Sequence, residues 1–382
     1  MIRFQRPQLP AVAAIAAYYQ RAEDARWYSN FGPCHAQLVE RLEQRLGGGL
    51  HAVPVANCTL GISLALVAAT GLAPGDRETA GREVIVPSYT FAATATAIVW
   101  AGLTPVFVDV DPGHWSMDPA ALEQALQERG DRVAAVMACT TFGSPPPVAV
   151  SQAWERLAAD AGVPLLIDSA AGFGALDAAG RAAGHLGDVE IFSWHATKPF
   201  AIGEGGLLCT ADAALAERLN RLANFGFEDG VVTGAPGMNA KLAEWPAATA
   251  LAVLDDFDDV LEARRDAATR LRTALAGTGL TFQELDSQPA WQFLAALAPA
   301  GTSRDDIVAV TAEHGVEVRS YFAHPLHRMP AFADAPRIGS LPVTEDLAIR
   351  ALSLPMANDL TDAEHEAIVS AVHRSLASVG AR

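Results

Sequence analysis

The sequence predicts an α/β protein in which a mostly parallel β-sheet is covered by helices on both faces. From about residue 36 to about residue 210, short apolar runs alternate with helical segments, and this alternation is typical of a parallel sheet. The chain has 382 residues, of which 51% are hydrophobic and 19% are charged, so it is long enough for two globular domains. We expect a large domain at residues 1–250, with an N-terminal arm, and a smaller α+β domain at residues 251–382.

The elements of the large domain follow from its periodicity. Charged residues on one face predict a helix at 36–46, and a second helix is expected at 61–69, after a turn at 57–59. Short apolar runs predict strands at residues 84–86, 106–109, 133–137, 165–167, 189–193 and 207–209.

Residues 84–108 carry no charge and form a stretch long enough to span a membrane. Pro87, Gly102 and Pro105 interrupt this stretch, and its periodicity divides it into a strand, a short helix and a second strand. We therefore expect a buried strand–helix–strand unit there rather than a membrane span.

The smaller domain begins with a helical connector. Residues 242–275 carry Asp, Glu and Arg at helical spacing, which predicts a long helix that leaves the large domain. Strands near 293–297 and 317–321 and a final helix from residue 362 then indicate an α+β domain.

A lysine near the end of a buried strand is the first candidate for chemistry. The strand at 189–193 runs into Ser193-Trp194-His195-Ala196-Thr197-Lys198, and a glycine-rich turn follows at residues 203–206. A lysine in an apolar pocket loses part of its charge, because burial disfavours the ammonium form. The neutral amine can then form a Schiff base with an aldehyde, so Lys198 is a candidate nucleophile.

A carboxylate near the end of a second strand is the partner candidate. The run at 165–167 is followed by Asp168 and then by small residues and glycines. An aspartate at the carboxyl end of a strand faces the crevice where α/β proteins bind ligands. Pyridoxal phosphate requires such a carboxylate at its ring nitrogen, because the ion pair keeps the ring protonated and able to accept electrons.

In these two segments the chain resembles the DegT-type aminotransferases, which are pyridoxal-phosphate enzymes of fold type I that make amino sugars. The likeness extends from about residue 30 to about residue 371. Further segments that carry it are residues 57–60 (NCTL), 84–94 (VIVPSYTFAAT), 237–242 (GMNAKL), 321–327 (YFAHPLH) and 351–356 (ALSLPM).

The resemblance implies a role for each matching residue. Lys198 and Asp168 would be catalytic, and both would also contact the cofactor. The other residues implied to bind the cofactor are Thr59, Cys58, Phe91, Ser193 and, from the neighbouring subunit, Asn239.

Two positions depart from the family pattern. Ala171 stands where the family often has Gln or His near the ring hydroxyl of the cofactor, so this contact is absent or made by water. Cys58 stands where Gly is common in the phosphate loop, which leaves Thr59 usable as a ligand.

Substrate contacts are left open between two interpretations. His324 and His327 are candidates for sugar hydroxyls or members of a polar loop. Lys241 and Arg319 are candidate cations for a diphosphate or surface ion-pair partners, and for Arg319 the ion pair is favoured. His195 is a candidate proton shuttle, although a structural role is favoured.

Three aspartates, Asp109, Asp111 and Asp118, surround Trp115 in the sequence. We interpret them as parts of a turn at a strand end and expect no metal site.

These residues predict a homodimeric aminotransferase that uses pyridoxal 5′-phosphate to move an amino group from glutamate or glutamine to a keto-sugar, which we expect to be linked to a nucleotide. The alternatives are a sugar 3-dehydratase of the same fold, an aminotransferase for a keto-cyclitol or an aromatic amino acid, and a regulatory protein that binds the cofactor without turnover. Relatives with the dehydratase activity carry His where this chain has Lys198, which argues against the first.

Composition restricts the remaining classes. The net charge of −17 argues against a nucleic-acid partner, because the phosphate backbone requires a basic face. Four cysteines show no metal spacing and no paired framework, which is typical of a reducing compartment. Residues 1–10 carry charges and prolines and do not resemble a signal peptide. We therefore expect a cytoplasmic protein without a membrane partner.

Overall fold

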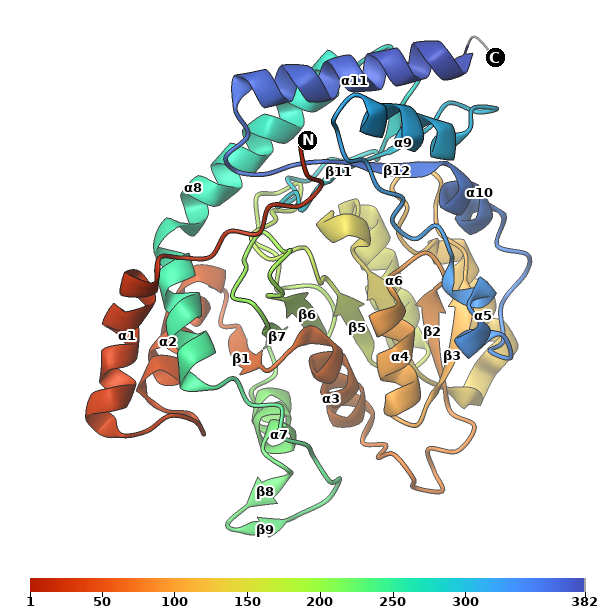
Figure 1. Ribbon diagram of the computed structural model, residues 1–382. Coiled ribbons are helices and arrows are strands. Elements are labelled where there is room, and N and C mark those ends of the chain that lie inside the picture. Colours follow the sequence, from red (N-terminus) through yellow and green to blue (C-terminus); the bar gives the residue numbers. More distant parts are fainter. Residues whose placement is uncertain (381–382) are drawn as a thin grey trace.

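The computed structural model describes residues 1–380 and has a seven-stranded β-sheet at its centre, with the order β1-β7-β6-β5-β4-β2-β3 (Figure 1). All strands of this sheet except β7 run parallel, and β7 runs antiparallel to both of its neighbours. The predicted mostly parallel sheet is thereby confirmed. Its strands are β1 (His51–Val55), β2 (Glu83–Pro87), β3 (Thr104–Val108), β4 (Val133–Cys139), β5 (Leu165–Asp168), β6 (Val189–Ser193) and β7 (Gly206–Thr210).

Helices cover both faces of the sheet. The helices of the described chain are α1 (Val12–Ala25), α2 (Pro33–Leu46), α3 (Cys58–Thr70), α4 (Ala92–Trp100), α5 (Pro119–Arg129), α6 (Val148–Asp160), α7 (Ala213–Ala223), α8 (Glu244–Ala274), α9 (Arg304–Glu313), α10 (Pro342–Arg350) and α11 (Asp362–Gly380). Along β2, Val84 and Val86 pack with α3, α4 and α7, whereas Ile85 packs with α5 and α6. This alternation explains why β2 is apolar at every position rather than at every second one.

The uncharged stretch at residues 84–108 forms the strand–helix–strand unit that the sequence predicts, namely β2, α4 and β3. Within residues 1–380, none of the helices is both long enough and apolar enough to cross a membrane.

Two sequence predictions differ from the structure. The sequence analysis missed β1, a five-residue strand that contains Pro54. Proline lacks the N–H that a central strand needs, but β1 lies at the edge of the sheet and pairs only with β7.

The predicted strand at residues 317–321 is wrong. The backbone there makes only a single bridge between Arg319 and Ser353, next to another bridge between Ile2 and Val316. The chain then bends away at Phe322, which has a left-handed φ of 57°. A strand cannot continue through that conformation.

A second, antiparallel sheet lies near the C-terminal end of α8. It consists of β10 (Thr281–Phe282), β11 (Leu294–Leu297) and β12 (Ala351–Leu354). The first half of α8 packs with α1 and α2 against the large sheet, and its second half packs with α11 and the small sheet. The proposed division at residue 250 falls inside this single helix and stays a prediction.

The N-terminal arm lies against the C-terminal part of the chain, which the sequence did not predict. Phe4 is fully buried and packs against Phe293 and Tyr321, with ring centroids 5.3 and 5.5 Å apart. Arg6 forms ion pairs with Asp359 and Glu364. These contacts hold residues 5–10 in place as one wall of a cavity described below.

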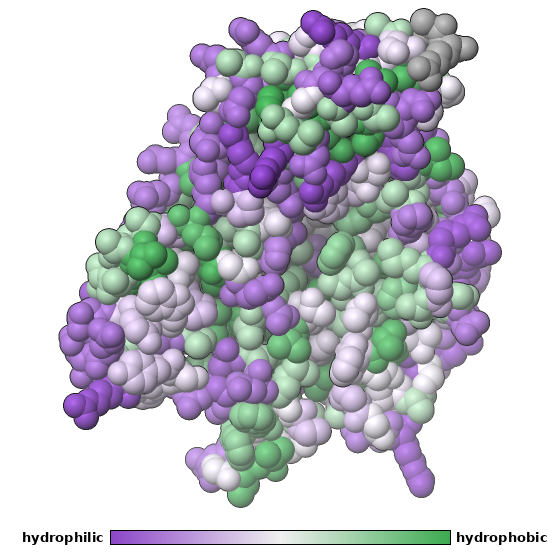
Figure 2. Space-filling view, viewed as in Figure 1, coloured by the Kyte–Doolittle hydropathy of each residue, from purple (hydrophilic) through white to green (hydrophobic). Residues whose placement is uncertain are grey.

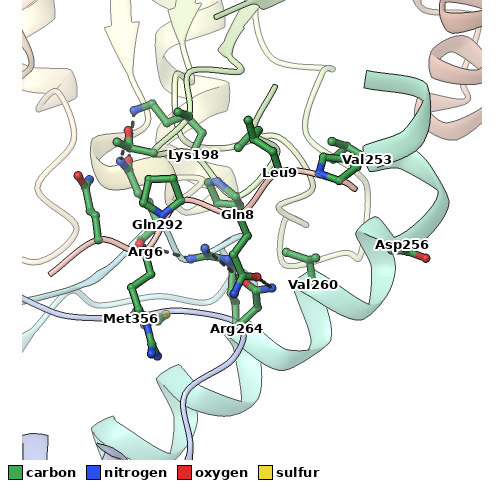
Figure 3. A pocket seen from close by; sticks show the side chains of 18 of the residues that line it. Arg6, Gln8, Leu9, Lys198, Val253, Asp256, Val260, Arg264, Gln292 and Met356 are labelled. Carbon is green, nitrogen blue, oxygen red and sulfur yellow. Dashed lines mark hydrogen bonds between the residues drawn. The ribbon is translucent and has the colours of Figure 1, made fainter. Parts of the chain in front are cut away.

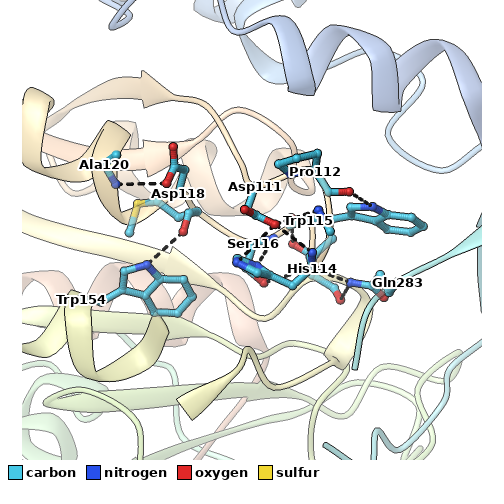
Figure 4. Close-up of polar contacts among 12 residues, drawn as sticks. Asp111, Pro112, His114, Trp115, Ser116, Asp118, Ala120, Trp154 and Gln283 are labelled. Atoms are coloured by element: carbon cyan, nitrogen blue, oxygen red, sulfur yellow. Dashed lines mark hydrogen bonds and ion pairs between the residues drawn. The ribbon is translucent and has the colours of Figure 1, made fainter. Parts of the chain in front are cut away.

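The turn after β3 has the structural role that the sequence predicts for its aspartates (Figure 4). Asp111 Oδ1 accepts the backbone N–H groups of Gly113 (2.7 Å) and His114 (3.1 Å), and Asp118 caps α5. The buried side chain of Gln283 closes the turn from the small sheet by donating to His114 O at 3.0 Å.

Gly206, at the start of β7, lies where β7 approaches the start of α3. A Cβ at this position would lie 2.8 Å from Cys58 N and 3.0 Å from both the carbonyl carbon of Asn57 and Phe192 O. These are backbone atoms, which cannot rotate away. Glycine therefore allows the first turn of α3 to reach the end of β6.

We expect Gly206→Ala to destabilise the protein by about 1–3 kcal/mol, because the new methyl group must displace backbone. The measurement is the midpoint of urea unfolding followed by circular dichroism. Gly113→Ala is the control, since its Cβ would mainly meet the flexible end of Glu284. Equal midpoints for Gly206→Ala and the wild type would contradict the close approach.

Candidate active site

The candidate site lies at the carboxyl ends of the parallel strands. Asp168 is the last residue of β5 and pairs with Cys139, the last residue of β4. Ser193 is the last residue of β6 and pairs with Gly206. Ligands of α/β proteins bind at this edge of the sheet. The structure thus brings Asp168, Ser193 and the start of α3 to one edge.

Asp168 is a buried carboxylate whose hydrogen bonds come from neutral donors. Thr94 Oγ1, in the first turn of α4, donates to Oδ2 at 2.6 Å, and the Ala170 N–H donates to Oδ1 at 3.1 Å. Burial raises the pKa of the Asp168 carboxyl, while these hydrogen bonds and the charge of Lys198 lower it. Within residues 1–380, no side-chain ion pair to Asp168 is formed. The carboxylate is therefore suited to a further cationic partner.

Lys198 lies beyond β6, and its amine donates to Oε1 of Gln292 at 3.2 Å (Figure 3). Burial lowers the pKa of the Lys198 amine, and Cys58 and Asp168 oppose this shift. The amine is therefore easier to deprotonate than that of a solvent-exposed lysine. A nucleophilic amine must lose its proton in this way.

The first turn of α3 forms the other end of the site. The sequence predicts that Thr59 precedes the helix. The helix instead begins at Cys58, so Thr59 lies inside its first turn. The N-cap is Asn57, whose side chain accepts the N–H of Leu60 at 2.9 Å. The N–H groups of Cys58 and Thr59 have no partner within the helix, and such groups attract anions.

The Cys58 side chain is buried, and burial raises its thiol pKa well above the usual range. Ser193 is also buried, and its Oγ accepts the N–H of His195 at 3.3 Å.

Phe91 is the N-cap residue of α4 and is 59% exposed, three residues before Thr94. An exposed phenyl ring one turn before a residue that bonds the buried carboxylate is not a core residue and suits stacking on a bound ring. Ala171 is buried, and its methyl group offers no hydrogen bond to a ligand.

Asn239 and Lys241 lie on the segment between the exposed hairpin of β8 (Phe227–Glu228) and β9 (Val231–Val232) and the start of α8. Asn239 is exposed. The Lys241 amine donates to Asn224 Oδ1 at 2.7 Å and lies 4.8 Å from the ring centre of Phe225. Burial lowers the pKa of this amine, so Lys241 already has a structural environment.

The remaining substrate candidates are His324, His327 and Arg319, and two of them are already engaged by other side chains. His324 is exposed. His327 is buried, with its Nδ1 2.7 Å from Ser88 Oγ and its Nε2 2.8 Å from Glu345 Oε1, so both ring nitrogens are engaged within the fold. Arg319 pairs with Glu317, as the favoured ion-pair interpretation expected.

The donor set at this edge fits pyridoxal phosphate. Asp168 lacks a cationic partner among the described residues, as a group that binds a protonated ring nitrogen would. The first turn of α3 presents free N–H groups for a phosphate, and Lys198 provides the amine. The residues that would hold the cofactor thus agree with the chemistry that it requires.

The sequence analysis missed two residues that hold this arrangement. Thr94 lies within the family-like segment at residues 84–94, but only its bond to Asp168 distinguishes it. Gln292 is buried at the entry to β11. A polar residue directly before an apolar strand was the available signal.

A cavity of about 270 Å³ adjoins Lys198 on the side of the N-terminal arm (Figure 3). The cavity is lined by residues 5–10, α8 and Gln292. Its lining does not include Asp168, Ser193, Thr59 or Phe91. The cavity therefore adjoins the candidate amine, whereas the candidate cofactor ligands at the strand ends lie outside its lining.

A family model described as the DegT/DnrJ/EryC1/StrS aminotransferase family matches residues 11–373. Protein Rv3402c of Mycobacterium tuberculosis is 34% identical and covers 98% of this chain and 90% of its own. The UDP-N-acetyl-3-dehydro-alpha-D-glucosamine 3-aminotransferase of Acidithiobacillus ferrooxidans is 33% identical and covers 87% and 86%.

Solved structures agree with these matches. DesI, crystallised with its TDP-sugar product, is 34% identical, has a TM-score of 0.88 and covers 98% of this chain and 93% of its own. A Bacillus cereus protein assigned as a PLP-dependent aminotransferase has a TM-score of 0.90 at 28% identity and covers 97% and 99%. The fold type I architecture that the sequence predicts is thereby confirmed.

We expect Asp168→Asn to lower the rate of amino transfer by about 10- to 100-fold, because it removes a charge-assisted hydrogen bond worth about 1.5–3 kcal/mol. The measurement is the rate at which glutamate changes the absorbance of the bound cofactor. Asp109→Asn is the matched control, since this carboxylate accepts the N–H groups of Val343 and Thr344 and lies at another strand end. If both variants react as the wild type does, Asp168 is only a strand-end residue.

Proposed function

The chain belongs to the DegT/DnrJ/EryC1/StrS aminotransferase family, and we propose that it transfers the amino group of glutamate or glutamine to a keto-sugar linked to a nucleotide. Members of this family use pyridoxal phosphate, and the chain is a PLP-dependent aminotransferase. The observation that carries the proposal is that Lys198, whose amine burial shifts toward the neutral form, lies near the buried carboxylate of Asp168, which forms no side-chain ion pair within the described chain.

Each residue has a defined task in this proposal. Pyridoxal phosphate, when bound, supplies an aldehyde and a ring that accepts electrons. Lys198 would hold the aldehyde between turnovers and, once released, would move the proton that leaves the α-carbon of the donor. Asp168 would keep the ring nitrogen protonated, and Phe91 would stack on the ring.

The phosphate group is proposed to bind at the first turn of α3. The N–H groups of Cys58 and Thr59 and the Thr59 hydroxyl are donors there, and the Ser193 hydroxyl lies on the neighbouring strand end. Gly206 supports this arrangement, because it brings the first turn of α3 against the start of β7.

We propose that the partner subunit's copy of Asn239 completes this phosphate site. Asn239 is exposed in the single chain and follows the projecting β8–β9 hairpin. Apolar side chains gather on that hairpin, at the bottom of the view in Figure 2. They are Phe225, Phe227, Val231 and Val232, each at least 43% exposed. An apolar projection of this kind favours burial against a second copy of the chain.

The nucleotide-linked substrate is supported by the named relatives, of which one acts on a UDP-sugar and one is seen with a TDP-sugar product. His324 remains a candidate for a sugar contact, because it is exposed. The buried environments of His327 and Lys241 and the ion pair of Arg319 favour structural roles for these three residues.

The test is a screen of nucleotide-linked 3-keto and 4-keto sugars with glutamate or glutamine that carries heavy nitrogen in its amino group. We expect labelled amino-sugar nucleotide from at least one substrate, detected by mass spectrometry. Lys198→Ala should lower the rate by about 10²–10⁴-fold, because it removes the group that moves the proton. Keto-cyclitols are screened in parallel, and labelled product from these alone would reject the nucleotide-sugar assignment.

The shared site predicts complementation between two inactive variants. We expect Asn239→Ala and Lys198→Ala to be weak or inactive alone. In a heterodimer of the two, one site carries both defects and the other carries neither, so activity per dimer should recover to as much as half that of the wild type. The measurement is the rate of purified, verified heterodimers obtained by co-expression.

If Asn239 serves its own subunit instead, each site of the heterodimer carries one defect and no activity returns. That result, or full activity of Asn239→Ala alone, would reject the shared site.

A further inference from the structure

The amine of Lys198 has one hydrogen-bond acceptor in residues 1–380, the side-chain oxygen of Gln292 at 3.2 Å. Gln292 is 6% exposed and lies just before β11 of the small sheet, whereas Lys198 follows a strand of the large sheet. The contact therefore joins the two parts of the fold at the reactive amine.

The orientation of the Gln292 amide follows from its second contact. Its Nε2 donates to Thr197 Oγ1 at 3.4 Å, and Thr197 Oγ1 lies 2.9 Å from Nδ1 of His195. The Thr197 N–H also donates to this Nδ1 at 3.3 Å, so Nδ1 is an acceptor and the Thr197 hydroxyl must donate to it. The hydroxyl oxygen is then free to accept from Gln292, which turns the amide oxygen toward Lys198.

The backbone that carries Gln292 is fixed independently. Trp291, directly before it, has a left-handed φ of 56°, which is uncommon for a bulky residue. Arg264, on α8, donates to Trp291 O at 2.9 Å and to Gln292 O at 3.5 Å. Backbone strain that the surrounding structure maintains is typical of functional positions.

We propose that Gln292 is a positioning residue: its amide oxygen holds one N–H of Lys198, so that the nitrogen lone pair points to the cofactor aldehyde. Thr197 and His195 set the orientation of that amide. This inference rests on the proposed function, because it assumes that Lys198 is the reactive amine. It adds a residue from the small sheet to a site that is otherwise built on the large sheet.

Charged groups lie at both ends of this chain of contacts, and between them the Arg264 guanidinium contacts the backbone oxygen of Gln292. Asp168 lies near the amine, as does the thiol of Cys58, which its raised pKa keeps protonated. At the outer end, His195 Nε2 lies 3.7 Å from Glu204 Oε1, and both side chains are exposed. Gln292 and Thr197 are neutral between them, so an acceptor lost at Gln292 changes the environment of the amine without removing a charge.

The experiment measures the apparent pKa of Lys198 in the cofactor-free protein. An amine-reactive reagent is applied across a pH series, and labelling of the Lys198 peptide is followed by mass spectrometry. We expect Gln292→Ala to lower this pKa by about one unit, because the acceptor stabilises the ammonium form more than the amine. Gln292→Glu should raise it, because a carboxylate then faces the ammonium group.

Kinetics provide the second measurement. We expect Gln292→Ala to lower kcat by about tenfold while KM for both substrates changes by less than about twofold, as for an interaction needed in the chemical steps rather than in binding. Gln283→Ala is the matched control: this glutamine is equally buried (4% exposed) but holds the turn after β3. It should change neither kcat nor the pKa of Lys198.

The orientation is tested at Thr197. Thr197→Val should produce part of the Gln292→Ala effect, and Thr197→Ser should restore wild-type values because it retains the hydroxyl. If Gln292→Ala does not fold, Gln292→Glu and Thr197→Val carry the test, since both keep the side-chain volume. Unchanged pKa and kcat in these variants, or equal changes in Gln283→Ala, would overturn the proposal.

Borohydride reduction of the wild type distinguishes failure of the proposed site from failure of the positioning role of Gln292. If the pyridoxyl group is fixed to a lysine other than Lys198, the proposed site itself is wrong. If it is fixed to Lys198 and the Gln292 variants behave as the wild type does, only the positioning role of Gln292 is rejected.

Discussion

The site depends on one electrostatic constraint: a buried carboxylate and a partly buried amine lie at the same edge of a sheet. Burial disfavours the ionised form of both Asp168 and Lys198, and each charge partly stabilises the other. Neutral donors stabilise the carboxylate further without neutralising it. The arrangement therefore favours a ligand that brings a positive charge to Asp168 and a carbonyl group to Lys198, which are the two features of the pyridoxal ring.

The topology of the sheet brings these groups together. Parallel strands end at one edge, so Asp168 and Ser193 meet there although 25 positions separate their numbers in the sequence. The single antiparallel strand, β7, then starts at that edge instead of ending there. Gly206 consequently lies beside Ser193 and contacts the first turn of α3, which follows an edge strand on the far side of β7.

Much of this could be predicted from sequence, for physical reasons that differ between elements. Buried parallel strands are mostly apolar runs, so β2 to β6 could be predicted. Asp168 and Lys198 were recognisable because each comes at or shortly after the end of such a run. Strand β1 was missed because Pro54 lies inside it. The expected strand at 317–321 does not form, and Phe322 directly after it has a left-handed φ that the sequence pattern does not reveal. The contact of Gln292 with Lys198 arises only from tertiary packing, and so do the contacts of His327 with Ser88 and Glu345. The roles of the site residues and the boundary between the domains stay predictions.

The docking of the N-terminal arm has a consequence for the order of folding. The Arg6–Glu364 contact joins residues 358 positions apart, and the contact of the Phe4 N–H with Glu317 joins residues 313 positions apart. Contacts between such distant residues carry a high loop-closure entropy and form only when the intervening structure exists. We therefore expect the arm to close the cavity beside Lys198 late in folding, after both sheets have formed. Until then this side of the lysine would be open to solvent, and small molecules could reach the amine before the wall is complete.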